Sequence, residues 1–113
     1  MLLFKKKFLP AIREGEKTQT IRLWKHRRLR AGQRSYIPGA GHIRIVTVEQ
    51  VQLDALTDDD ARPDGFQSAE ALHAEIKQLY PEQLAAGHQA YRVVFELLPA
   101  EEQEKQAKAR RRK

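Results

Sequence analysis

The sequence predicts one α+β domain, a small open β-barrel of about five or six strands flanked by two to three helices. Three observations lead to this prediction. The chain has 113 residues, the size of one domain. Short apolar stretches with the alternation of strands are separated by glycine and proline. Residues 45–48 are apolar on both faces, which indicates a strand covered on both sides, as in a small barrel.

The first third of the chain is expected to hold two strands joined by a short helix. Residues 2–5 are short and apolar, like a first strand. The helix covers residues 10–14, because Pro10 suits a first helical turn and Gly15 suits a left-handed C-terminal cap. A strand follows over residues 18–23. The basic segment 24–30 is expected to be a mobile loop, in which Trp24 is either a stacking residue for RNA bases or a core residue.

Two strands are predicted in the middle of the chain. A short strand over residues 34–37 ends at a Pro-Gly turn. The longest strand covers residues 42–53. Alternation places one set of its side chains on one face and Arg44, Val46, Val48 and Gln50 on the other. The first set is Ile43, Ile45, Thr47, Glu49 and Val51.

Helix signals dominate the next segment. Thr57 is a good N-cap, and the three aspartates after it are expected to stabilise the first helical turn rather than to bind a metal. Ser68 caps the main helix over residues 69–80, whose Leu72, Ile76 and Leu79 form the buried stripe. Pro81 ends this helix, a loop follows, and the last strand covers residues 91–97. We therefore divide the chain into a domain over 1–98 and a charged tail over 99–113, helical or disordered.

Composition and charge narrow the classes of function. The net charge is +6, and residues 1–34 hold eleven Lys/Arg against two acidic residues, while residues 105–113 add six basic residues. This distribution suits a polyanion such as RNA, although solvated surface lysines give the same pattern. No apolar run of ~18 residues and no secretory signal is present, so we expect a cytoplasmic protein without a membrane span.

Several kinds of site are not expected. The chain has no cysteine, which excludes disulfides, thiol nucleophiles and thiolate metal sites. Its four histidines lack the spacing of zinc ligands, so no metal is predicted. Neither a phosphate-binding glycine loop nor a hydrolase serine motif occurs, and no cofactor is predicted.

The most chemically suggestive stretch is Gly15-Glu16-Lys17-Thr18-Gln19-Thr20-Ile21-Arg22. Lys17 lies in the turn before a strand, so its long side chain is able to curl toward the face that carries Thr18, Thr20 and Arg22. A cation beside a hydroxyl favours the alkoxide, and a desolvated neutral lysine accepts the proton itself. The alternative is that the threonines favour the strand and that Lys17 and Arg22 are solvated.

Three sequence pieces in order resemble the ASCH domain, a family similar to the PUA modules of RNA modification. They are the stretch above, Leu56-Thr57 running to Asp64-Gly65-Phe66, and Leu79-Tyr80-Pro81 before a last strand through Phe95. The resemblance covers residues 2–98 and implies a PUA-like open barrel, with a cleft where the first motif meets the Asp64 bend. It also implies work on RNA or a modified nucleoside. We predict no cofactor and, with the oligomeric state left open by the sequence, favour a monomer.

Some small bacterial members of that family are amidohydrolases that remove the acetyl group from acetylated cytidine. The resemblance carries their catalytic set over to Lys17, Thr20 and Asp64. Asp64 stands where those members have glutamate, and Gln33 stands where an aspartate commonly follows the glycine. The implied mechanism has Thr20 as nucleophile, Lys17 assisting its deprotonation and Asp64 giving the leaving amine its proton. Arg22 is expected to hold the oxyanion or an RNA phosphate.

A non-catalytic RNA-binding module that uses the same cleft is the alternative from another class. A ribonuclease ranks third, because no histidine pair supports general acid-base cleavage. The residues expected to contact RNA are Lys5, Lys6, Lys7, Arg22, Trp24, Lys25, Arg27 and Arg28.

Overall fold

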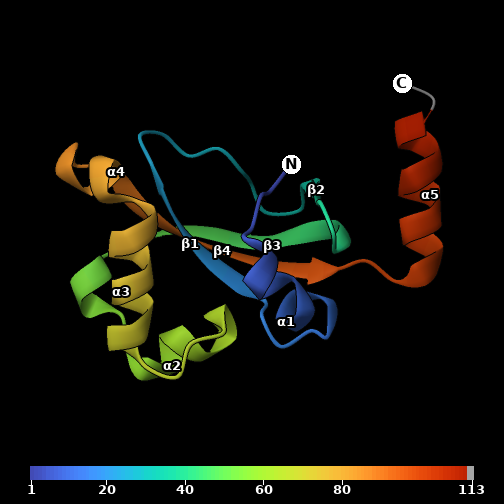
Figure 1. Ribbon diagram of the computed structural model, residues 1–113. Coiled ribbons are helices and arrows are strands. Elements are labelled where there is room, and N and C mark those ends of the chain that lie inside the picture. The colour runs from blue at the N-terminus through green and yellow to red at the C-terminus, as the bar shows by residue number, and fades with distance from the viewer. Residues whose placement is uncertain (112–113) are drawn as a thin grey trace.

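The structure is a computed structural model that describes residues 1–111, and these form an α+β domain around one antiparallel sheet (Figure 1). The sheet has the strand order β1-β4-β3-β2 and is open. Its strands are β1 (Gln19–Trp24), β2 (Arg34–Ile37), β3 (Gly41–Val51) and β4 (Gln89–Leu97). The two long strands, β3 and β4, form its centre, so β1 and β2 are its edges.

The predicted barrel of about five or six strands is not what the described residues form. Residues 2–5 make no strand. Leu2 N donates one backbone hydrogen bond to β2, to Tyr36 O at 2.9 Å. The edges β1 and β2 pair with β4 and β3 and not with each other. Closure of a barrel requires such pairing, so four strands remain an open sheet.

A β-bulge changes which side chains of β3 face the core. The pairing of β3 with β4 shifts between Ile45 and Thr47. An extra residue in one strand moves the following side chains to the opposite face. Val48 is therefore buried in the same cluster as Ile43 and Ile45, whereas uninterrupted alternation predicted it on the other face.

The helices begin at the caps that the sequence predicts. Helix α2 (Asp58–Ala61) has a capping box in which Thr57 Oγ1 accepts from Asp60 N, and Asp60 accepts from Thr57 N. The 3₁₀ helix η3 (Arg62–Asp64) follows it. Helix α3 (Ala69–Leu79) begins with Ser68 accepting from Ala71 N at 3.1 Å. Both predicted N-caps are thus confirmed.

Shorter helices complete this half of the molecule. The N-terminal segment contains the 3₁₀ helix η1 (Lys6–Phe8) and then α1 (Leu9–Arg13). Glu14 is the C-cap of α1, and the next residue, Gly15, has the predicted left-handed conformation with a φ of +79°. Another 3₁₀ helix, η2 (Leu53–Ala55), follows β3. The loop expected after Pro81 is instead α4 (Pro81–Ala85), because proline at the first position of a helix needs no N–H donor.

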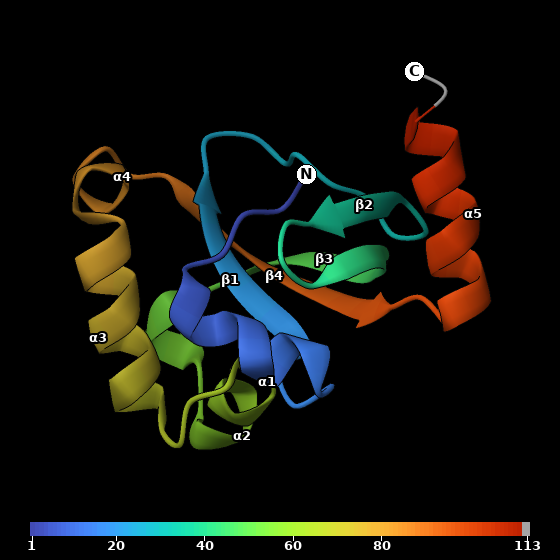
Figure 2. The ribbon, with the colours of Figure 1, turned by 45° about the vertical axis from the view of Figure 1, so that its right-hand side comes forward.

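Each face of the sheet carries its own hydrophobic cluster. One cluster joins the N-terminal segment to the sheet through Leu2, Ile12, Val93 and Phe95. The other joins α3 to β1 through Ile21, Leu23, Leu72 and Ile76. Because β1 is an edge strand, the N-terminal segment and α3 both reach past its open side. Figure 2 shows the N-terminal segment running across β1 with α3 standing beside it.

The tail forms the helix α5 (Ala100–Arg111), which stands at the opposite end of the sheet from α3 in both views (Figures 1 and 2). Gln103 attaches it to β3, since its amide accepts from His42 N and donates to His42 O, each at 2.6 Å. Within α5, Glu104 and Lys108 form an ion pair at i, i+4 spacing, 3.8 Å apart. Residues 112–113 of the predicted tail lie outside the described residues.

Candidate functional site

A cavity of about 310 Å³ lies beside the open edge of β1. Side chains of the N-terminal segment form one wall, and α3 with Tyr80 forms another. Thr20 and Arg22 of β1, Lys17 before this strand and Asp64 of η3 complete the lining. The apolar surfaces that cover the two faces of the sheet therefore leave a space where the sheet ends.

Lys17 and Asp64 form a buried pair in this cavity, and their side chains are only 3% and 4% exposed. The ammonium Nζ lies 2.5 Å from Asp64 Oδ1 and also donates to the Asp64 backbone carbonyl. A backbone bond from Thr18 N to Pro63 O, 2.8 Å long, joins the two segments. It holds Lys17 close to Asp64, which lies 47 positions further along the sequence.

Aromatic rings surround the Lys17 ammonium. The centroids of Phe8, Phe66 and Phe4 lie 4.9, 5.6 and 5.7 Å from Nζ. Phe8 and Phe66 also contact each other edge to face, with 5.9 Å between centroids. Ring faces attract a cation, but they provide no hydrogen bonds and exclude water. The lysine is therefore held by Asp64 in an otherwise apolar surrounding.

Burial changes the proton affinity of both members of the pair. Desolvation lowers the pKa of Lys17, and the nearby Asp64 offsets only part of this effect. Desolvation likewise raises the pKa of Asp64, against the opposing influence of Lys17 and Gln19. Both directions favour the uncharged forms, a neutral amine next to a protonated carboxyl.

Arg22 supports the Thr20 hydroxyl. Its Nε donates to Thr20 Oγ1 at 3.0 Å, while another of its nitrogens donates to Leu3 O at 2.7 Å. The guanidinium lies over the Phe4 ring, 4.6 Å from the centroid. This contact places a positive charge against the one hydroxyl oxygen of β1 that lines the cavity, which stabilises negative charge on that oxygen.

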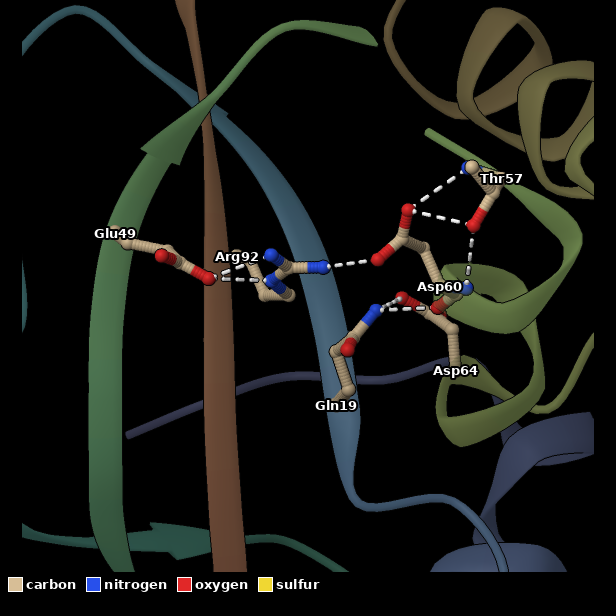
Figure 3. Close-up of polar contacts among 6 residues, drawn as sticks. All are labelled: Gln19, Glu49, Thr57, Asp60, Asp64 and Arg92. Carbon is tan, nitrogen blue, oxygen red and sulfur yellow. Dashed lines mark hydrogen bonds and ion pairs between the residues drawn. The ribbon is translucent and has the colours of Figure 1, made fainter. Parts of the chain in front are cut away.

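A hydrogen-bond network holds the segment that carries Asp64 (Figure 3). Gln19 Nε2 donates to Asp60 O at 2.9 Å and to Asp64 Oδ2 at 3.3 Å. Arg92 of β4 links Asp60 to Glu49 of β3, with contacts of 2.6 Å to Asp60 Oδ1 and 2.7 Å from Nε to Glu49 Oε1. Side chains of β1, β3 and β4 thus hold the segment that carries Asp64. Gln19 contacts Asp64 Oδ2, while Lys17 Nζ contacts Oδ1.

The structure brings together Lys17, Thr20, Asp64 and Arg22, which all line the cavity. The carboxylate of Asp64 is long enough to reach Lys17, although it is one methylene shorter than glutamate. Gln33, the other departure from the ASCH pattern, is an exposed residue immediately before β2. It does not line the cavity.

The residues predicted to contact RNA do not form one surface around the cavity. Lys5 and Arg22 line it, and Lys6 and Lys7 are exposed in η1 next to it. The remaining basic ones, Lys25, Arg27 and Arg28, are exposed after β1 and do not line the cavity. Trp24 packs against the core, with its ring 5.4 Å from that of Tyr91, so the choice left open by the sequence falls to a packing role.

Sequence reasoning missed several residues of the site. Phe4, Phe8 and Gln19 are not among the functional residues that the sequence predicts. Glu75 is buried within α3 and also lines the cavity. A signal for Glu75 was present, because it falls three residues after Leu72 and next to Ile76, on the apolar stripe of the helix.

The described part of the chain has neither a metal-binding cluster nor a membrane-spanning helix. Residues 1–111 contain no cluster of three or more His, Asp or Glu side chains arranged to hold a metal ion. Within those residues, no helix has the length and the apolar character that crossing a membrane requires.

Comparisons with known proteins identify the fold. Neither a protein-family model nor a curated protein matches the sequence significantly. Solved structures do match, among them the hypothetical protein PH0355, with a TM-score of 0.71, 16% identity and coverage of 85% of this chain and 95% of that chain. Protein EF3133 from Enterococcus faecalis V583, of family DUF984, matches with a TM-score of 0.68 and 18% identity over 81% of this chain and 67% of that chain.

A third match is the ASCH domain from Lactobacillus crispatus JV V101. It has a TM-score of 0.63 and 18% identity, and the alignment covers 78% of this chain and 68% of that chain. Identities this low carry information about the fold alone. The overall fold of this chain is thus similar to the folds of these three structures.

Proposed function

We propose that this chain, which has the fold of an ASCH domain, is an amidohydrolase that removes the acetyl group from acetylated cytidine, free or within RNA. The observation that supports this most is the buried Lys17–Asp64 pair in the same cavity as Thr20. Burying two charges costs several kcal/mol per ion in proteins, so such a pair is weak evidence for a stabilising role. Groups with perturbed pKa values in a cavity are more typical of catalysis.

The acylation step uses the uncharged form of the pair. The Lys17 amine accepts the hydroxyl proton of Thr20 while Thr20 Oγ1 attacks the acetyl carbonyl carbon. Arg22 stabilises the negative charge on that oxygen through its Nε–H. The protonated Asp64 then gives its proton to the amino nitrogen of cytosine as the C–N bond breaks. Cytidine leaves, and the acetyl group remains as an ester on Thr20.

The second step restores the enzyme. A water molecule attacks the ester carbonyl and gives its proton to the Asp64 carboxylate. When the ester bond breaks, the Lys17 ammonium returns its proton to Thr20 Oγ1. Acetic acid leaves and loses its proton to solvent. Over the cycle, one acetylated cytidine and one water become cytidine and acetate, and Lys17, Thr20 and Asp64 regain their initial protonation states.

The test is incubation of the purified protein with acetylated cytidine, with chromatography to measure the cytidine released. We expect turnover by the wild type and its loss by at least about 100-fold in Thr20→Val, a change of similar volume that removes the nucleophile. Thr47→Val is the matched control, since Thr47 is an exposed threonine of β3 outside the cavity. It should retain full activity.

An active, folded Thr20→Val protein would rule out Thr20 as the nucleophile. A wild type that releases no cytidine would favour the non-catalytic RNA-binding alternative. The exposed basic side chain of Lys5 in the cavity wall suits that role. In that case, single-stranded RNA should bind with an affinity that falls with salt, at a log-log slope of about −0.7 per phosphate contacted.

A further inference from the structure

Glu75 is a second carboxylate in the cavity that the proposed reaction does not use. It lies in the middle of α3, between the buried Leu72 and Ile76 of the apolar stripe, and its side chain is only 10% exposed. Aspartate and glutamate are almost never buried in this way unless they are paired. The position therefore requires an explanation beyond helix propensity.

The described residues satisfy this carboxylate only in part. Lys7 Nζ lies 2.7 Å from Glu75 Oε1, which is an ion pair with a lysine side chain that is 55% exposed. Oε1 itself is buried, so a ligand in the cavity does not reach it, whereas Oε2 is not buried in this way. A carboxylate has about four acceptor positions, and buried acceptors are nearly always occupied. Oε2 is therefore the oxygen of Glu75 that remains for a ligand in the cavity.

Glu75 is also separate from the reacting groups. It belongs to α3, whereas Lys17 and Thr20 belong to β1 and the turn before it, and Asp64 belongs to η3. Lys17 Nζ bonds to Asp64 and not to Glu75, and Glu75 has the weakest influence of the neighbours that change the pKa of Lys17. The cavity therefore offers one place for chemistry and another for recognition.

We propose that Glu75 accepts hydrogen bonds from the ribose hydroxyls of the substrate, so that the cavity selects ribonucleosides over deoxyribonucleosides. This inference rests on the proposed function. When the acetyl amide faces Thr20 and Lys17, the carbonyl oxygens and ring nitrogen of the base are acceptors, which a carboxylate cannot bind. The sugar hydroxyls are the donors that remain, and Glu75 Oε2 is the acceptor that faces them. Lys7 contacts the other oxygen, Oε1, from the rim.

The experiment is isothermal titration calorimetry with cytidine and 2′-deoxycytidine, which measures recognition without any turnover. We expect the wild type to bind cytidine on the order of 10-fold more tightly, since one hydrogen bond to a charged group is lost with the 2′-hydroxyl. Glu75→Leu, which fits the apolar stripe of α3, should bind both nucleosides equally. Glu75→Gln should keep part of the preference, because its amide oxygen still accepts.

The control is Glu70→Gln, a substitution on the exposed face of the same helix, which should leave the preference unchanged. Equal binding of the two nucleosides by the wild type, or no binding of either, would overturn the inference without any variant. A preference retained in Glu75→Leu would also overturn it. Turnover without a ribose preference leaves the proposed function intact, whereas a ribose preference without turnover supports Glu75 recognition and contradicts the amidohydrolase.

Discussion

Two ion pairs of this protein differ sharply in their surroundings. Lys17 and Asp64 meet beside the edge strand β1 with side chains 3% and 4% exposed, among the rings of Phe4, Phe8 and Phe66. Arg44 and Glu96 meet across β3 and β4, 2.8 Å apart, with side chains 38% and 53% exposed. Both pairs have short contacts and opposite charges, so their geometry alone does not distinguish them.

The difference in burial gives the two pairs different physical consequences. Water solvates Arg44 and Glu96, so their contact contributes roughly 0–1 kcal/mol. Around Lys17 and Asp64 water is excluded, so the charged forms lose hydration that their mutual attraction only partly replaces. The comparison teaches that burial, and not the contact distance, shifts the pKa values of Lys17 and Asp64, while the exposed pair is a minor surface contact.

Breaking the buried pair should have the largest effect on stability. Lys17→Met leaves Asp64 buried without its partner, and we expect a loss of about 3 kcal/mol in the free energy of unfolding, measured by urea denaturation. The double variant Lys17→Met/Asp64→Leu should be at least as stable as the wild type, because two apolar side chains replace a buried pair. Both variants should be inactive. A double variant clearly less stable than the wild type would show that the pair stabilises the fold.

The pH dependence of stability provides the next test of this contrast. The folded-state pKa of Asp64 is raised above 3.8, so wild-type stability should fall as pH rises through 3.8 to that raised value, since the unfolded chain releases the proton first. The folded-state pKa of Lys17 is lowered below 10.5, so stability should rise again as pH increases from that lowered value to 10.5. These trends are measured as the difference in unfolding free energy between the wild type and the double variant. A difference that does not change with pH would contradict the assigned directions.

Loosening the network around Asp64 should have a smaller effect. Gln19→Leu removes the donor to Asp64 Oδ2 and to Asp60 O, which should lower stability by about 1–2 kcal/mol. We expect kcat to fall by about 10-fold with KM unchanged, since Gln19 positions Asp64 and does not line the cavity. The apparent pKa of the limb on which activity falls with rising pH should move upward, because the reaction needs protonated Asp64 and the Gln19 hydrogen bond lowers the pKa of Asp64.

The matched control for this variant is Gln50→Leu, which removes an exposed side-chain hydrogen bond between β3 and β4. It should leave both kcat and the pH profile unchanged. A Gln19→Leu protein that changes KM alone would indicate that Gln19 acts on binding and not through Asp64.

Breaking the exposed pair should have the smallest effect. Arg44→Gln should change the free energy of unfolding by no more than about 1 kcal/mol, because solvent already screens its contact with Glu96. Whatever difference exists should diminish further in 1 M salt, where the Debye length is about 3 Å. Turnover should be unaffected. A loss comparable to that of Lys17→Met would remove the contrast between the two pairs.

Local features of the fold were predictable because neighbouring residues decide them. Gly15 has the left-handed conformation expected of it, and Thr57 and Ser68 cap their helices. Features set by a partner strand were not predictable. The bulge at Ile45/Thr47 depends on the register with β4, and residues 2–5 fail to form a strand because they make one backbone bond to Tyr36 instead of a ladder.

The candidate site divides along the same line. The residue types of the Gly15–Arg22 stretch pointed to Lys17 and Thr20, and the resemblance to the ASCH domain pointed to Asp64. The aromatic rings, Gln19 and Glu75 were not selected, since each is an ordinary residue of a strand or helix until the chain folds around the cavity.

The sequence by itself determined the α+β class, the caps, the uneven charge and the polar groups available for chemistry, because these depend on composition and on neighbours along the chain. The tertiary structure alone decided that Lys17 meets Asp64 across 47 residues and that Phe4, Phe8 and Phe66 exclude water from the pair. It also decided that the pKa of Lys17 is lowered and the pKa of Asp64 is raised. Desolvation is the physical reason, since it depends on every group that surrounds a charge and not on the residues that precede and follow it.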